Sequence, residues 1–187
     1  MARRCKFCKS TELPPAAKCT DIIQKKGYCS VKCLADHQAD KRIKAREKKE
    51  RKKLAEAKER VKTRSQWQRE AQTAFNAYIR ERDKDLPCVS CGRHHEGQYH
   101  AGHYRTTAAA PQLRFDERNV WKQCAPCNNH LSGNIANYRP ELIKRIGQSQ
   151  VDEIENNAEI KRWTIEELKQ IKDEYKAKLK ELKQRSI

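Results

Sequence analysis

Residues 88–134 read CVSCGRHHEGQYHAGHYRTTAAAPQLRFDERNVWKQCAPCNNHLSGN, and this stretch decides the fold. It holds two Cys-x-x-Cys pairs, Cys88 with Cys91 and Cys124 with Cys127, separated by 32 residues. Each pair presents two sulfurs on a tight turn, which is the usual pattern of a structural zinc site with four thiolate ligands. Four thiolates leave no open coordination position, so we expect this zinc to fold the module and not to catalyse. The long insertion between the pairs leaves room for a β-hairpin.

The composition of the 187-residue chain is strongly basic. Its 42 lysines and arginines outnumber 25 aspartates and glutamates, which gives a formal net charge of +17. An excess of this size is the electrostatic footprint of a protein that neutralises phosphates, so we expect nucleic acid as the partner. The alternative is a charged surface that only keeps the protein soluble. Hydrophobic and charged residues each make up 36% of the chain, which predicts small modules instead of one large core.

The nine cysteines indicate metal sites and not disulfides. The chain begins MARRCKFCKS without an apolar signal-peptide core, and no run of about 18 apolar residues occurs in it. These features predict a cytoplasmic protein with reduced thiols and without a membrane partner.

Residues 1–37 form the first of four predicted segments and hold a second cysteine pattern. Cys-x-x-Cys is followed by Cys-x-x-x-Cys, with the cysteines Cys5, Cys8, Cys29 and Cys33. We expect them to bind a second structural zinc ion in an N-terminal knuckle. Cys19 is left over, and His37 is a competing ligand on an expected helix. The knuckle is either a finger that binds a DNA junction or a protein partner, or a small folded cap.

Residues 38–84 are expected to form a basic helical linker. They lack glycine and proline and are rich in residues that favour helices. Between Lys41 and Arg64, 13 lysines and arginines stand against four glutamates. We expect one long helix or two, which either follows a nucleic-acid backbone or is a solvated linker. The end of the segment has apolar residues at helical spacing that predict docking against the next module, namely Trp67, Ala71, Phe75, Tyr78 and Ile79.

Residues 141–187 are expected to be a region of amphipathic helices. Pro140 is expected to open a helix that ends at Gly147, and a short helical stretch follows over residues 151–154.

The last helix has the clearest signal. Thr164 and Glu167 form a capping-box pattern at its start. Its apolar stripe consists of Ile165, Leu168, Ile171, Tyr175, Leu179 and Leu182. The stripe packs either on the domain or against a second copy in a homodimer.

The segment 85–140 resembles the zinc-containing HNH (ββα-metal) endonucleases. After the first cysteine pair comes Gly102-His103, Asn119 lies five residues before the third cysteine, and Asn128 directly follows the fourth. The runs AGHYRT, LRFDERNVWKQC and CNNHLSGN, the N-terminal knuckle and the RWTIEE sequence resemble the NinG (Rap) recombination proteins of lambda-type phages over nearly the whole chain. The expected fold is α-rich and modular, a small α+β protein with an HNH module on its four-cysteine knuckle. The cytoplasm would then be that of the host cell.

The HNH resemblance implies a role for each matching residue. His103 is the expected general base that takes a proton from the attacking water; its alternative role is a hydrogen bond within the hairpin. Asn119 is expected to hold the loop near His103 through backbone hydrogen bonds. Asn128 is the expected ligand of a catalytic Mg²⁺ or Mn²⁺ ion.

One position departs from the HNH pattern. Many members have an aspartate directly before the general base as a second ligand, whereas this chain has Gly102. His100, Asn129 and His130 are nearby substitutes, and we count His130 among the candidate catalytic residues. Two or more imidazoles would favour Mn²⁺, Co²⁺ or Ni²⁺ over Mg²⁺.

Several basic residues of the same segment are candidates to hold a phosphate, namely Arg105, Arg114, Arg118 and Lys122. We favour Arg105, because it follows His103 by two residues and is expected on the same strand face. His94 and His95 lie in a turn and are expected to face solvent.

The sequence therefore predicts a metal-dependent DNA endonuclease. The NinG resemblance implies branched recombination intermediates, such as D-loops and Holliday junctions, as substrates, and other recombination proteins as partners. The alternative is a non-catalytic zinc-finger protein that binds nucleic acid. A third possibility is an adaptor that binds partners through its last helix.

Overall fold

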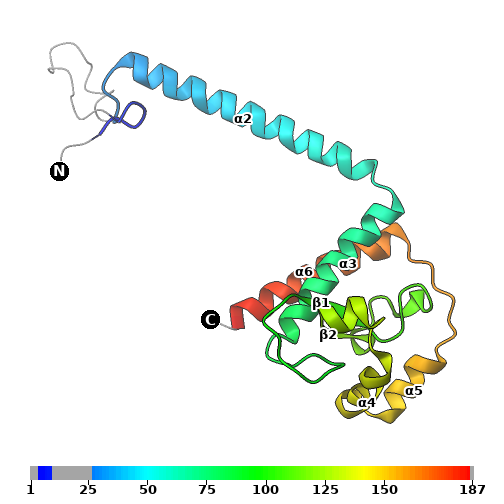
Figure 1. Ribbon diagram of the computed structural model, residues 1–187. Coiled ribbons are helices and arrows are strands. Elements are labelled where there is room, and N and C mark those ends of the chain that lie inside the picture. Colours follow the sequence, from blue (N-terminus) through cyan, green and yellow to red (C-terminus); the bar gives the residue numbers. More distant parts are fainter. Residues whose placement is uncertain (1–3, 10–26, 186–187) are drawn as a thin grey trace. The chain divides into compact units, whose positions relative to one another are not determined.

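The computed structural model describes residues 4–9 and 27–185, and most of them are helical (Figure 1). The chain divides into two compact units, residues 1–62 and residues 63–187. The mainly helical fold with one small sheet confirms the predicted class. The finer division into four segments stays a prediction.

Among the described residues, no helix has both the length and the apolar character needed to span a membrane.

The first unit contains the long basic helix α2, Val31–Arg60. Ser30 caps it, because the Ser30 side chain accepts a hydrogen bond from the backbone N–H of Cys33. Every residue from 41 to 60 is exposed. This part of α2 therefore has no buried face within the described structure, as its composition predicted.

The basic segment contains two helices, and Thr63 begins the second one, α3, Arg64–Arg82. The Thr63 side chain accepts from the backbone of Gln66, and the Gln66 side chain accepts from the backbone N–H of Thr63 at 2.7 Å. This capping box satisfies donors that a helix start leaves free.

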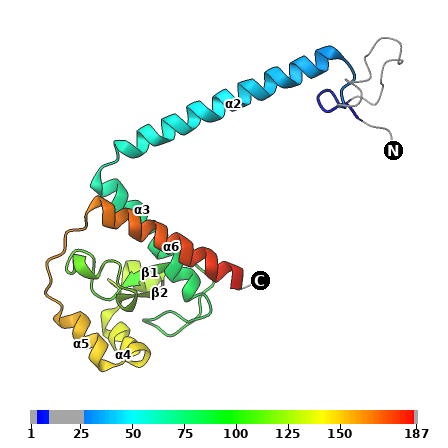
Figure 2. The same ribbon diagram turned by 180° about the vertical axis from the view of Figure 1, so that it is seen from behind.

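Helices α3 and α6, Ile165–Arg185, lie side by side in the second unit (Figures 1 and 2). The predicted capping box is confirmed, since the Thr164 backbone donates to Glu167 at 2.8 Å and the Glu167 backbone donates to Thr164 at 3.2 Å. The first part of the apolar stripe of α6 packs on α3 and joins one core with Trp67 and Phe75. The stripe residues in this core are Ile165, Leu168, Ile171 and Tyr175. The aromatic residues of α3 are thus core residues, as expected.

The expected hairpin is present as strands β1, Tyr99–His103, and β2, Val120–Cys124, which pair antiparallel. Its two faces join different cores. Ala101 and Val120 belong to the α3–α6 core, whereas Trp121 packs with the second core formed with α4 and α5. The sheet therefore separates two layers of helices.

Helix α4, Ile135–Ile146, begins earlier than we predicted. A start at Pro140 is wrong, because the chain turns into the helix at Asn134, which has a left-handed backbone (φ 46°, ψ 53°). The backbone N–H of Tyr138 bonds to the Asn134 carbonyl at 3.0 Å, and the Tyr138 ring is fully buried. Burial of the Tyr138 side chain favours a helix that begins before Pro140. Pro140 itself has no backbone N–H to donate, and it lies on the exposed side of the helix. Helix α5, Gln148–Asn156, includes the second predicted stretch.

We predict that Phe75→Ala destabilises the second unit by about 3–5 kcal/mol, the usual cost of truncating a buried aromatic side chain. Phe75 is 0% exposed, and its ring meets those of Tyr175 and Phe115 at centroid distances of 4.7 and 5.7 Å. Denaturant unfolding measures the change. The control is Ile160→Ala at a position that is 97% exposed, which should change the free energy of unfolding by less than about 0.5 kcal/mol. Equal losses for both variants would contradict the packing described.

Candidate functional site

The four cysteines of the central knuckle meet at one point. The sulfurs of Cys88, Cys91, Cys124 and Cys127 all lie within 4.8 Å of one another. A tetrahedral zinc ion with Zn–S bonds of about 2.3 Å needs sulfurs about 3.8 Å apart. The Cys91 and Cys124 sulfurs are 3.9 Å apart, so the cluster can hold zinc with little change.

Donor groups surround these sulfurs. The backbone N–H of Cys124 points at the Cys88 sulfur, at 3.4 Å. Burial raises the pKa of Cys88, but backbone donors outweigh it and lower that pKa to about 7, which favours the thiolate. His95 does not simply face solvent as we predicted. It is half-buried, and its Nε2 lies 3.2 Å from the Cys91 sulfur, so it supports the ligand cluster.

The N-terminal tetrad is also present. The sulfurs of Cys5, Cys8, Cys29 and Cys33 lie within 4.8 Å of one another. His37, the competing ligand, is engaged elsewhere, because its Nδ1 lies 2.9 Å from the Tyr28 hydroxyl and its ring stacks on Phe7. Cys19 lies outside the described residues. Both tetrads can therefore hold zinc through four thiolates.

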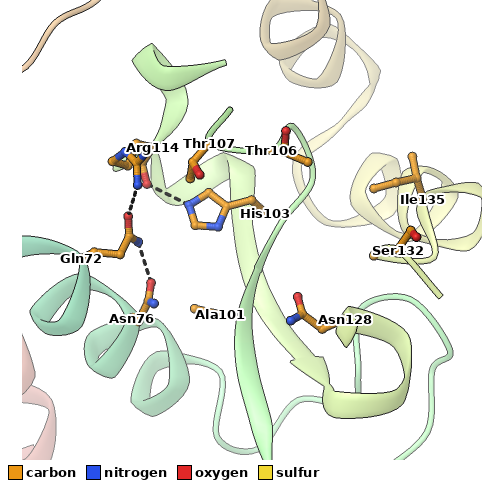
Figure 3. Close-up of a pocket in the computed structure, with 11 residues that line it drawn as sticks. Gln72, Asn76, Ala101, His103, Thr106, Thr107, Arg114, Asn128, Ser132 and Ile135 are labelled. Atoms are coloured by element: carbon orange, nitrogen blue, oxygen red, sulfur yellow. Dashed lines mark hydrogen bonds between the residues drawn. The ribbon is translucent and has the colours of Figure 1, made fainter. Parts of the chain in front are cut away.

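An open pocket of about 510 Å³ lies beside the hairpin in the second unit (Figure 3). It brings together residues from α3, β1, the β1–β2 loop and the turn after the knuckle. Among the described residues that line it, none is acidic. The lining residues are Gln72, Asn76, Ala101, His103, Thr106, Thr107, Arg114, Asn128, Ser132, Gly133 and Ile135.

His103 is the last residue of β1, and a hydrogen bond fixes its ring. Its Nε2 lies 3.0 Å from the backbone carbonyl oxygen of Arg114 (Figure 3). A carbonyl oxygen can only accept, so Nε2 carries the proton of the neutral ring and Nδ1 is the basic nitrogen. Burial lowers the pKa of His103 below its usual value of 6.5, aided by the positive charge of Arg114. The imidazole is therefore neutral near pH 7.

Asn119 is fully buried and closes the loop between the strands. Its Oδ1 accepts from the backbone N–H of Arg105 at 2.8 Å. Its Nδ2 donates to the carbonyls of Arg105 at 3.0 Å and Leu113 at 3.2 Å. Leu113 directly precedes Arg114, whose carbonyl holds the His103 ring. Asn119 thus fixes the segment that orients His103, through the kind of backbone hydrogen bonds that we expected.

Asn128 lines the pocket from a single π-helical turn, Pro126–His130, and not from the start of a regular helix. The wide turn is closed by the bond from the Leu131 N–H to the Pro126 carbonyl at 3.2 Å. The Asn128 amide nitrogen donates to Asn129 at 2.8 Å, which leaves its carbonyl oxygen free to act as a ligand. Asn129 and His130 themselves are exposed, and neither is among the residues of this pocket.

The structure explains the glycine that departs from the HNH pattern. A Cβ added at Gly102 would lie 2.1 Å from Oε1 of Gln123, so the Gln123 side chain fills the place of an aspartate. Gln123 is fully buried, and its amide nitrogen donates to Ser90 and to the Gly133 carbonyl. Within the described structure, its Oε1 is buried and has no hydrogen-bond partner.

His100 pairs with Gln123 across the two strands, and its Nε2 is likewise buried and without a partner among the described residues. Directly paired residues point to the same face of a sheet. Because residues alternate between the two faces of a strand, this pair lies on the face opposite Ala101 and His103, and neither His100 nor Gln123 lines the pocket.

Arg105, our favoured phosphate ligand, does not line the pocket of His103. The strand ends at His103, and the Arg105 guanidinium donates to the carbonyls of Ile154 and Glu155 at the end of α5. The arginine beside His103 is Arg114. The strand alternation on which we based the preference does not extend into the loop.

Helix α3 contributes to the pocket, although its sequence predicted no site there. Gln72 and Asn76 lie one turn apart on α3, and the amide nitrogen of Gln72 donates to Asn76 at 2.7 Å (Figure 3). The i, i+4 spacing was visible, but polar residues on a helix usually indicate a solvated face. Thr106, Thr107 and Ser132 also line the pocket without a sequence signal.

Comparison with known proteins decides the family. A family model described as the bacteriophage lambda NinG protein matches residues 1–185. The chain belongs to the NinG family. It is 58% identical to protein ninG of Escherichia phage lambda over 170 residues, which cover 83% of each chain.

Other NinG relatives are nearly as similar. Protein ninG of Salmonella phage P22 is 56% identical over 170 residues, covering 83% of this chain and 84% of the relative. Protein ninG of Escherichia phage 933W is 49% identical over 195 aligned positions, covering 97% of this chain and 94% of the relative. No solved structure matches the chain.

We predict two zinc ions per chain, measured by native mass spectrometry. Cys124→Ser should leave one ion and destabilise the second unit, because that unit loses a ligand of its central tetrad. His37→Ala is the matched control and should keep both ions, since His37 is no part of the N-terminal tetrad. Loss of zinc from His37→Ala would contradict the ligand set described here.

Proposed function

We propose that this protein is a metal-dependent DNA endonuclease that cuts branched recombination intermediates, such as D-loops and Holliday junctions. One observation carries the proposal: the His103 ring has its Nε2 held by the Arg114 carbonyl while the ring lines an open pocket with Asn128. This arrangement supports an imidazole that accepts a proton through Nδ1. The branched substrate is supported by the resemblance to recombination proteins.

His103 acts in this proposal as the general base. The bond from Nε2 to the Arg114 carbonyl leaves Nδ1 as the nitrogen that can take a proton from the attacking water, and it stabilises the imidazolium that then forms. The lowered pKa keeps the ring neutral before the reaction. Asn119 is a positioning residue, because it holds the loop whose carbonyl orients the ring.

A divalent metal ion completes the proposed site. When bound, the ion stabilises the negative charge that develops on the phosphate and on the leaving 3′-oxygen. Asn128 would hold it through its carbonyl oxygen. An amide carbonyl oxygen suits either Mg²⁺ or Mn²⁺, so we expect cleavage with both ions.

Helix α2 supports the choice of DNA as substrate. Its exposed lysines and arginines can follow a phosphate backbone without reading bases, which suits recognition of shape. A symmetric cut across a junction needs two active sites, so we propose that a homodimer acts on such substrates. Other recombination proteins are further proposed partners.

The second candidate function is a non-catalytic zinc protein that binds nucleic acid. The absence of an acidic residue among the described residues of the pocket favours it, because most catalytic Mg²⁺ sites include a carboxylate.

We predict that His103→Ala lowers cleavage of a branched DNA in Mn²⁺ by about 100-fold or more, the usual contribution of a general base. DNA binding should stay within a few-fold of the parent protein. The assay compares Holliday junction, D-loop, linear and single-stranded DNA in Mg²⁺ and in Mn²⁺. His94→Ala, at an exposed position, is the control and should cut normally. If the zinc-loaded parent cuts none of these DNAs, the protein is a binding protein.

The pH dependence gives a separate prediction. A histidine with a lowered pKa binds its proton only as the pH falls below 6.5, and the protonated ring can no longer accept a proton. The cleavage rate should therefore fall on the acid side with a midpoint below pH 6.5. A pH–rate profile measures it, and a midpoint clearly above 6.5 would exclude His103 in this environment as the base.

A further inference from the structure

We propose that Arg114, Gln72 and Asn76 form a binding site for one phosphodiester group, and that this site binds DNA without any divalent metal. The inference deepens the proposed function, because it places the phosphate beside His103. It concerns binding, however, and can be tested separately from cleavage.

Arg114 differs from four other arginines near the hairpin. Arg82 is paired with Asp83 at 2.7 Å, and Arg118 with Asp116 at 2.8 Å. Arg139 is likewise paired with a carboxylate, and Arg105 donates to backbone carbonyls. For Arg114, no carboxylate lies within ion-pair distance in the part of the chain that the structure describes.

This arginine is held in place without being neutralised. Its Nη1 donates to Oε1 of Gln72 at 3.2 Å, and the side chain is half-buried at the pocket wall (Figure 3). Burial disfavours the charged guanidinium and lowers its pKa, but an arginine still keeps its proton near pH 7. A fixed positive charge without a carboxylate partner attracts an anion from solution.

The hydrogen bonds between the two amides orient further donors. Since Gln72 accepts from Arg114, its amide nitrogen is the group that donates to Oδ1 of Asn76. Asn76 then has its own amide nitrogen available, and it lines the same pocket. The Thr106 hydroxyl accepts from the Ala109 N–H, so its proton can also point to an anion.

The charge of the pocket decides the order of binding. Its described lining carries the Arg114 cation and no acidic residue, so the pocket repels a free divalent ion and attracts a phosphate. A bound phosphodiester would make the pocket attractive to a divalent metal ion, because it supplies the negative oxygens that Mg²⁺ and Mn²⁺ prefer. The DNA phosphate is therefore expected to bind first, and the metal ion afterwards.

The test uses the zinc-loaded full chain with ¹⁵N-labelled arginine, in buffer without added divalent metal. The dinucleotide dTpdT, which has one phosphodiester group, is titrated to millimolar concentration while the arginine Nε–Hε resonances are followed by NMR. We expect the Arg114 resonance to move and the resonance of Arg118, which is already paired, to stay. Movement of Arg118 alone would overturn the proposal.

Gln72→Glu is the decisive variant, because it places a carboxylate beside Arg114 with almost no change of shape. We expect it to weaken dTpdT binding by about tenfold or more, as Arg114→Gln should. The matched controls are Gln170→Glu and Arg69→Gln, at exposed positions of α6 and α3, which make the same charge changes outside the pocket. Zinc content and the NMR spectrum show that each variant is folded.

If Gln72→Glu binds dTpdT as tightly as Gln170→Glu, the proposed site does not exist. If dTpdT binds only after Mn²⁺ is added, the proposed order of binding is wrong. A wrong nuclease proposal gives a different result: the parent protein cuts no DNA, while dTpdT still moves the Arg114 resonance.

Discussion

The second unit depends on four sulfurs that come from two distant turns and lie within 4.8 Å of one another. One turn precedes strand β1, and the other directly follows strand β2. A zinc ion bound by these sulfurs would fix the start of β1 beside the end of β2. Through Cys127 it would also fix the turn that carries Asn128. The pocket would then be positioned by a metal that does not touch it, since a four-thiolate site is closed.

Hydrogen bonds to backbone carbonyls orient the His103 ring of the pocket. Asn119 holds the Leu113 carbonyl, and the next carbonyl along the chain, that of Arg114, holds the His103 ring. The side chain of the same Arg114 is held by Gln72 from helix α3. One loop residue, Arg114, thus connects the His103 ring on β1 with Gln72 on helix α3.

The sequence predicted what local spacing determines. The cysteine pairs, the apolar stripes and the Thr164 capping box each follow from residues a few positions apart, and the structure has all of them. The break before α3 has the same kind of local signal, since Thr63 and Gln66 are spaced as a capping box. The family resemblance supplied His103, Asn119 and Asn128.

What the sequence could not show depends on tertiary position. Arg105 and Arg114 lie in one irregular loop, where alternation no longer tells which side chain points to the pocket. Gln72 is a polar residue of the kind that usually lies on the solvated face of a helix. Its contact with Arg114 forms only in the folded protein. The left-handed turn at Asn134 moved the start of α4, because burial of Tyr138 outweighed the preference of Pro140 for the first turn.

Helix α2 behaves differently from these packed elements. Because residues 41 to 60 are all exposed, their helical state rests on intrinsic propensity and on pairs such as Lys44 with Asp40, at 2.7 Å. Unwinding of turns in this stretch would therefore cost no core packing. Its many like charges repel one another, so polyanions that neutralise them would also stabilise the helix. In this segment, ionic strength acts on the conformation of the chain as well as on its contacts.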